Sequence, residues 1–170
     1  MKNIEIKAKC VDLDALRKRI KNAGGRYVAT MKQVDTYFNV PKGRMKLREI
    51  DDKESMLVYY ERPDQLSSKE SNYFIYPSAD GKTLKETLAM SLGVNIVVKK
   101  VRELYMIGYT RVHLDEVYTL GQFMELETVI TTQTENEARQ ENLDIIDKLQ
   151  IRPSDMIKNS YSDMLEKGRF

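Results

Sequence analysis

Charged side chains recur at every second position in several short segments of the sequence. In the first of these segments, Glu5, Lys7 and Lys9 alternate with apolar residues. Successive side chains of a β-strand point to opposite faces of the sheet, so such a segment has one ionic face and one apolar face. A sheet with a solvated outer face would show this alternation too. The same spacing recurs at Lys46 and Arg48, Lys100 and Arg102, Arg111, His113 and Asp115, and Glu125 and Glu127.

The residue types in these segments suit the binding of phosphates together with a divalent metal. Arg can pair with a phosphate through two donors at once, and Lys provides a compact positive charge. Paired carboxylates supply the hard oxygen ligands that Mg²⁺ and Mn²⁺ prefer. One His and one Cys in the whole chain leave no multi-histidine or cysteine metal site, so carboxylates would have to hold the metal.

Length and composition indicate a globular chain without a broad basic surface. The 170 residues are enough for one domain with a real core, and 41% of them are hydrophobic. The net charge is only +2, from 28 basic and 26 acidic side chains, which disfavours non-specific nucleic-acid binding. No stretch reaches the length of a membrane span, and the N-terminus has no apolar signal core. We therefore expect a cytoplasmic protein that binds neither nucleic acid nor membrane.

The charged segments must be held by strands, and the sequence predicts eight of them. A helix capped by Asp12 is expected before Gly24, and another helix at 83–92. A third is expected at 135–150, and a last one begins at Pro153, with Ser154 or Asp155 as its cap. The strands are expected at residues 3–9, 27–40, 44–50, 55–62, 72–76, 96–105, 109–117 and 122–132.

Short hairpin connections between most of these strands favour an antiparallel sheet. Eight antiparallel strands can close into a barrel that holds one small ligand. The sequence thus predicts an α+β fold, a closed eight-stranded antiparallel β-barrel with flanking helices. We expect one domain over residues 1–170, with residues 152–170 as a helical tail that packs on the barrel. The terminal helices could instead make a homodimer contact.

The order of the motifs resembles the CYTH superfamily, which contains class IV adenylyl cyclases, thiamine triphosphatases and inorganic triphosphatases. The opening NIEIKAK is similar to the family signature Glu-x-Glu-x-Lys, with Asn3 in place of the first Glu. The resemblance covers almost the whole chain, and the motifs taken together in this order are more specific than any one of them. The further motifs are QVDTYF at 33–38, KLR at 46–48, YER at 60–62, KVR at 100–102, HLDEV at 113–117, FMELE at 123–127 and YSD at 161–163.

This resemblance implies a triphosphate tunnel, a closed barrel whose interior is lined with charge. It implies that Mg²⁺ or Mn²⁺ is the cofactor and that Glu5, Asp115, Glu125 and Glu127 are the metal ligands. Glu5, Lys7, Arg111 and Asp115 are the implied catalytic residues. Phosphate contacts are implied for Lys7, Lys46, Arg48, Arg62, Lys100, Arg102 and Arg111.

The resemblance leaves three functions open. A cyclase would convert ATP to cyclic AMP and pyrophosphate, and the DTYF and YSD segments resemble the class IV cyclase branch most. A triphosphatase would hydrolyse tripolyphosphate, thiamine triphosphate or a nucleotide. The third alternative is a binding module without catalysis, which Asn3 suggests because an amide supplies no charge to a metal site.

Overall fold

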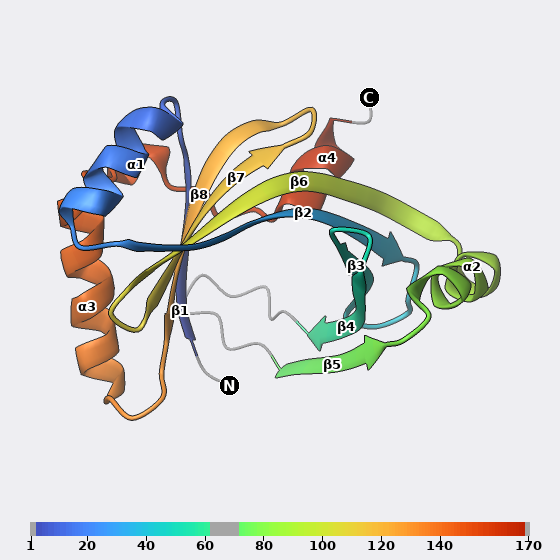
Figure 1. Cartoon of the computed structure of the whole chain (residues 1–170). Coiled ribbons are helices and arrows are strands. Elements are labelled where there is room, and N and C mark those ends of the chain that lie inside the picture. Colours follow the sequence, from blue (N-terminus) through green and yellow to red (C-terminus); the bar gives the residue numbers. More distant parts are fainter. Residues whose placement is uncertain (1–2, 62–71, 169–170) are drawn as a thin grey trace.

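Eight strands of the computed structural model form one antiparallel sheet (Figure 1). The structure describes residues 3–61 and 72–168. Neighbouring strands follow the order β1-β8-β7-β6-β2-β3-β4-β5. Their bounds are β1 Asn3–Lys9, β2 Arg26–Phe38, β3 Arg44–Ile50, β4 Glu54–Glu61, β5 Asn72–Ser78, β6 Val94–Ile107, β7 Thr110–Val117 and β8 Gly121–Val129.

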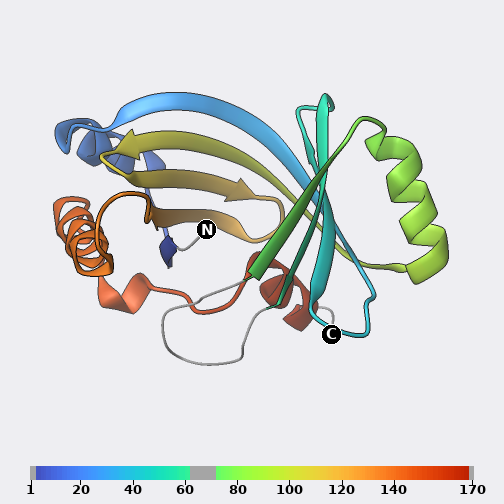
Figure 2. The ribbon, with the colours of Figure 1, turned by 90° about the horizontal axis from the view of Figure 1, so that it is seen from below.

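The sheet is strongly bent and has a concave face. Figure 2 shows β2, β6, β7 and β8 as an arch, with β3, β4 and β5 crossing it at a steep angle. The strand order makes β1 and β5 the two edges, and no pairing joins them within the described residues. The predicted α+β class and eight antiparallel strands are confirmed, but strand pairing does not close the barrel in this part of the chain. Alternation of residues is the same in an edge strand and in a closed barrel, so the sequence pattern cannot distinguish them.

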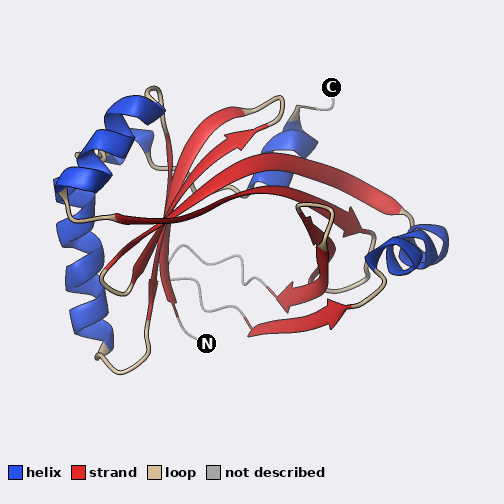
Figure 3. Cartoon of the chain, in the orientation of Figure 1, coloured by secondary structure: helices blue, strands red, loops and turns tan. Residues whose placement is uncertain are grey.

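Two helices cover the convex face of β1, β7 and β8 (Figures 1 and 3). Helix α1 spans Leu13–Asn22 and begins where the Asp12 side chain accepts a hydrogen bond from the Ala15 N–H at 2.9 Å. Helix α3 spans Glu135–Lys148 and begins with a capping box between Thr134 and Glu137. The apolar side chains buried between these helices and the strands are Ala8, Leu13, Leu16, Ile20, Val112, Leu114, Met124, Leu126, Ile145 and Leu149. Because these side chains pack between the helices and the sheet, the apolar faces of β1, β7 and β8 lie on the convex side. Their ionic faces lie on the concave side.

The C-terminal helix begins later than the sequence predicts. Pro153–Asp155 forms only a single 3₁₀ turn, and helix α4 spans Tyr161–Lys167 with Ser160 as its cap. The intervening chain is extended because it pairs with the edge of β1, where the Ile157 N–H donates to the Lys7 carbonyl at 2.8 Å. The expected caps at residues 154 and 155 are therefore wrong. Pairing with a free strand edge satisfies these backbone groups without a helix.

Helix α4 lies under the arch of the sheet, on its concave face (Figure 2). Tyr161 of this helix packs on Phe123 of β8, with ring centroids 5.1 Å apart. Around this contact lies a second buried cluster that fills one end of the concave face, formed by Tyr37, Ile96, Val98, Val117, Phe123 and Tyr161. The ionic part of the face is therefore bounded at this end by an apolar plug.

Helix α2, Gly81–Leu92, lies beside β2, β3 and β4 at the far end of the molecule (Figure 1). It begins at Asp80, whose side chain accepts a hydrogen bond from the Thr83 N–H at 3.0 Å. Among residues 3–61 and 72–168, no helix is long and apolar enough to cross a membrane.

Candidate functional site

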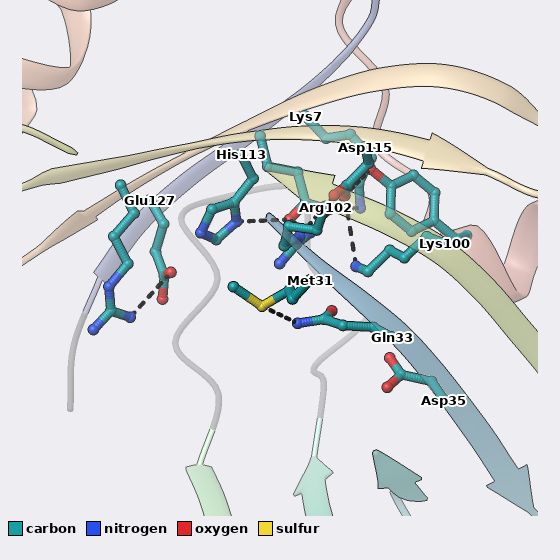
Figure 4. A network of polar contacts seen from close by, with 12 residues as sticks. Lys7, Met31, Gln33, Asp35, Lys100, Arg102, His113, Asp115 and Glu127 are labelled. Carbon is teal, nitrogen blue, oxygen red and sulfur yellow. Dashed lines mark hydrogen bonds and ion pairs between the residues drawn. The ribbon is translucent and has the colours of Figure 1, made fainter. Parts of the chain in front are cut away.

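The alternating charges of the sequence gather on the concave face. The strand register brings cations opposite carboxylates, with Lys7 facing Glu125 and Arg102 facing Asp115. Figure 4 shows this arrangement from close by. Among the residues predicted for the site, Arg62 lies outside the described residues. The others lie on strand positions that face this side, namely Glu5, Lys7, Lys46, Arg48, Lys100, Arg102, Arg111, Asp115, Glu125 and Glu127.

Arg102 stands at the centre of the first ion-pair cluster and is only 7% exposed. Its Nε donates to Asp115 Oδ1 at 2.7 Å, and its Nη2 also donates to Glu125 Oε2 at 2.8 Å. Lys7 Nζ forms an ion pair with Glu125 Oε1 at 2.9 Å. One guanidinium thus joins a buried carboxylate, Asp115, and a half-buried one, Glu125, that come from different strands.

Tyr161 joins this cluster from helix α4. Its hydroxyl donates to Asp115 Oδ2 at 2.8 Å, and its ring lies below two ammonium groups. Lys7 Nζ is 4.2 Å from the ring centroid, and Lys100 Nζ is 5.1 Å from it. Lys100 Nζ also lies 3.5 Å from Asp115 Oδ2. Cation–π contacts therefore hold both lysines next to the apolar plug, and Lys100 also shares Asp115 with Tyr161.

A second ion-pair cluster lies on β2 and β3, and Asp35 organises it. Asp35 Oδ1 and Oδ2 accept two hydrogen bonds from Arg48, both at 2.7 Å, and Lys46 Nζ donates to Oδ2 at 2.8 Å. Asp35 was not among the predicted site residues, although it lies within the DTYF motif. Asp35 lies two residues from Gln33 and two from Tyr37, so these three side chains share one strand face. This spacing in the sequence could have identified Asp35 as a site residue.

The cations keep the buried carboxylates charged. Burial alone would raise the pKa of Asp35, but the charges of Lys46 and Arg48 outweigh it and hold this pKa well below its ordinary value. Burial likewise would raise the pKa of Asp115 and Glu125, and nearby cations hold both below their ordinary values. The concave face therefore carries fixed charges of both signs.

The pKa values of two basic side chains on this face, Lys100 and His113, are lowered, which favours their neutral forms. Burial lowers the pKa of Lys100 to about 7, and the charge of Arg102 acts in the same direction. Burial and then Arg102 also lower the pKa of His113, whose Nδ1 lies 3.6 Å from Glu125 Oε2. Lys100 is thus poised to gain a proton when an anion approaches, and the lowered pKa of His113 favours its neutral form.

The carboxylates differ in how well they fit a divalent metal. Glu5 and Glu127 oppose each other directly on β1 and β8, and their oxygens are the ligands that Mg²⁺ and Mn²⁺ prefer. Asp115 and Glu125 are both bonded to Arg102. Residues 3–61 and 72–168 contain no group of three or more His, Cys, Asp or Glu side chains arranged to hold a metal. The pair on β1 and β8 could hold a divalent metal only together with further ligands, such as water or phosphate oxygens.

Asn3, which stands where the family has its first Glu, contacts the same pair. Its Nδ2 donates to Glu127 Oε1 at 2.5 Å. Arg111 Nη1 lies 3.3 Å from Glu127 Oε2, so this carboxylate has a neutral and a charged donor at once. Asn3 thus acts as a donor to Glu127 in the structure, a role that an ionised Glu side chain could not take.

The fold and the site together define a protein that presents cations and carboxylates inside a bent antiparallel sheet. The chain belongs to the CYTH domain family, whose model matches residues 1–161. A protein of Methanocaldococcus jannaschii, named "putative adenylate cyclase", is 26% identical over 172 residues, which are 96% of this chain and 98% of that protein.

Solved structures show the same fold. The PH1012 protein of Pyrococcus horikoshii has a TM-score of 0.83 and 24% identity, covering 95% of this chain and 98% of that one. A Hippeastrum protein has a TM-score of 0.69 and 15% identity, covering 99% and 97% of the two chains. It is described as a "putative adenylyl cyclase" with a dominant triphosphatase activity. Metal-dependent enzymes that act on triphosphates are typical of this family.

Proposed function

We propose that this protein is a metal-dependent enzyme that binds the triphosphate of a small molecule on its concave face and cleaves the phosphate chain. The observation that carries the proposal is the convergence of six cations from β1, β3, β6 and β7 on one face. These cations are Lys7, Lys46, Arg48, Lys100, Arg102 and Arg111. A triphosphate carries about four negative charges near neutral pH, which suits such a cluster.

The two ion-pair clusters would hold the phosphate chain from two sides. The more exposed cations, Arg48 and Arg111 at 21% and 43% of their side-chain surface, would meet phosphate oxygens first. Arg102 lies behind them and keeps Asp115 and Glu125 in place. A ligand that contacts both clusters would draw the two parts of the bent sheet together. Closure into the predicted barrel is part of this proposal.

Glu5 and Glu127 would hold Mg²⁺ or Mn²⁺. When bound, such an ion neutralises phosphate charge and lowers the pKa of an attacking hydroxyl or water. Lys7 and Arg111 lie beside these two carboxylates and would orient the phosphate that reacts. Asp115 would serve chiefly to position Arg102 and Lys100, and it could join a metal only by giving up these partners.

Two reactions fit this site. The cyclase name of the archaeal relative favours attack of the ATP 3′-hydroxyl on the α-phosphate, which forms cyclic AMP and releases pyrophosphate. The activity stated for the Hippeastrum protein favours hydrolysis as the second candidate. Both reactions need the same charges, because phosphoryl transfer depends mainly on positioning and charge stabilisation.

Product analysis distinguishes the candidates. The purified protein is incubated with ATP, tripolyphosphate or thiamine triphosphate, each with Mg²⁺ or Mn²⁺. Cyclic AMP with pyrophosphate would support the cyclase, and orthophosphate would support the triphosphatase. Tight binding without turnover in any combination would leave a binding module and refute the enzymatic proposal.

The replacement Asn3→Glu is expected to strengthen metal binding. The change removes a donor from Glu127 and adds a carboxylate beside it, so the metal concentration for half-maximal activity should fall about tenfold. Titration of the activity with Mg²⁺ measures this shift. Asn3→Gln, which keeps an amide, is the control. An unchanged metal requirement in Asn3→Glu would contradict the role given to this pair.

Proton uptake on binding is expected at pH 8 because the pKa of Lys100 is lowered to about 7. The lysine is mostly neutral at pH 8 in the free protein, and a bound triphosphate favours its charged form. Affinity should therefore be highest below pH 7 and fall as the pH rises through the pKa of the free protein. Calorimetry in two buffers of different protonation enthalpy measures the uptake. Lys100→Met should remove it, and undiminished uptake in this variant would contradict the assignment.

A further inference from the structure

Gln33 is a buried polar residue on the concave face that the charge clusters leave without a full set of partners. It lies on β2 and is 4% exposed. Its Nε2 donates to the sulfur of Met31 at 3.1 Å, and its Oε1 accepts no hydrogen bond from the part of the chain that the structure describes. Buried polar atoms in proteins are nearly always paired, so an unpaired acceptor next to a proposed ligand site calls for an explanation.

One other buried side-chain atom in the described residues lacks a hydrogen bond, His113 Nδ1. That atom has Glu125 Oε2 at 3.6 Å, so a small movement would pair it. Among residues 3–61 and 72–168, Gln33 Oε1 accepts a hydrogen bond from no donor. The two atoms are therefore not equivalent, and Gln33 is the one that points to a missing donor.

The position of Gln33 places its acceptor within the site. The register sets Gln33 opposite Lys100 on β6 and opposite Ile50 on β3. Met31, two residues earlier on the same strand face, is opposite Arg102. Figure 4 shows Met31, Gln33 and Asp35 along β2, on the side where Arg102 and Lys100 lie. Gln33 thus borders both ion-pair clusters.

A phosphate chain cannot satisfy this acceptor. Ionised phosphate oxygens are acceptors themselves, and a triphosphate at neutral pH offers no O–H or N–H group. Within a bound organic triphosphate, only the organic part can carry the donor that this acceptor lacks. Half-buried apolar side chains at Met31 and Ile50 adjoin this position, and Met sulfur makes favourable contacts with aromatic rings.

We propose that Gln33 is a specificity-determining residue that accepts a hydrogen bond from the organic part of the substrate. The substrate is then an organic triphosphate with an N–H or O–H donor on a ring or sugar, such as a nucleoside triphosphate, rather than inorganic tripolyphosphate. The inference rests on the proposed triphosphate site and names the substrate class for it.

The test compares the affinities of ATP and tripolyphosphate by calorimetry in EDTA, where the metal-dependent reaction does not proceed. Gln33→Met keeps the length and the contact with Met31 but removes the acceptor. We expect it to weaken ATP binding about tenfold and to change tripolyphosphate binding less than about twofold. Gln122→Met, the same change on the opposite face of β8, is the matched control and should alter neither affinity. Thermal unfolding of each variant verifies that it is folded.

The possible results separate this inference from the proposed function. An equal loss for both ligands would overturn the inference, because Gln33 would then act through the phosphate-binding cations such as Lys100. An unchanged ATP affinity in Gln33→Met would overturn it as well. Wild-type protein that binds tripolyphosphate but not ATP would overturn the inference alone. Wild-type protein that binds neither ligand, both in EDTA and with Mg²⁺ present, would overturn the proposed function together with it.

Discussion

Replacing Arg102 with methionine is expected to lower the free energy of unfolding by about 3–5 kcal/mol. Arg102 is the guanidinium that joins Asp115, which is fully buried, and Glu125, whose side chain is 12% exposed. Its removal leaves two carboxylates, which have little contact with solvent, with fewer partners. Lys7 still pairs with Glu125, which should keep the loss toward the lower end of this range. Urea unfolding of both proteins at pH 7 measures the difference.

Arg111→Met is the matched control for this prediction. Arg111 also pairs with a carboxylate on the concave face, but 43% of its side chain is exposed. Ion pairs with such exposure contribute about 1 kcal/mol or less, so the control should unfold at nearly the wild-type urea concentration. Equal losses in Arg102→Met and Arg111→Met would show that the buried cluster around Arg102 does not stabilise the fold as argued.

Replacing Glu127 with glutamine is expected to reduce turnover at least about 100-fold at a fixed concentration of Mg²⁺. The substitution keeps the shape of the side chain and removes one of the two opposed carboxylates on β1 and β8. Because Glu127 is only partly buried, the free energy of unfolding should change by less than about 1 kcal/mol. Initial rates over a range of metal concentrations should show a raised metal requirement as well as a lower maximum.

Glu116→Gln provides the control for the charge change. Glu116 lies on the other face of β7 and is exposed, so its loss alters net charge without touching the site. Its turnover should equal that of the wild type. Full activity of Glu127→Gln, with the wild-type metal requirement, would refute the metal role proposed for this residue.

Much of the ionic face could be predicted from the sequence because strand geometry is local. A spacing of two residues places Lys46 and Arg48 on one face whatever the rest of the fold does. The same reasoning placed Glu125 and Glu127 together on β8. The α+β class followed from the number of strand segments and their short connections, and the structure confirms it.

Other features depend on partners far away in the sequence. The late start of helix α4 follows from pairing of the Ile157 segment with the edge of β1, which no local signal at Pro153 reveals. The organising role of Asp35 depends on the β2–β3 register that sets it opposite Arg48. The expected closure of the barrel also depended on whether two distant edges pair, and the described strands leave β1 and β5 as edges.

The sequence by itself determined which charges share a strand face, and through the motif order it indicated the family. Only the tertiary structure decided which cation neutralises which carboxylate. Arg102 could have faced a metal-bound carboxylate or a phosphate, and the register instead pairs it with Asp115. The physical reason is that alternation is a property of one chain segment, whereas charge pairing depends on cross-strand distances that are set when the sheet forms.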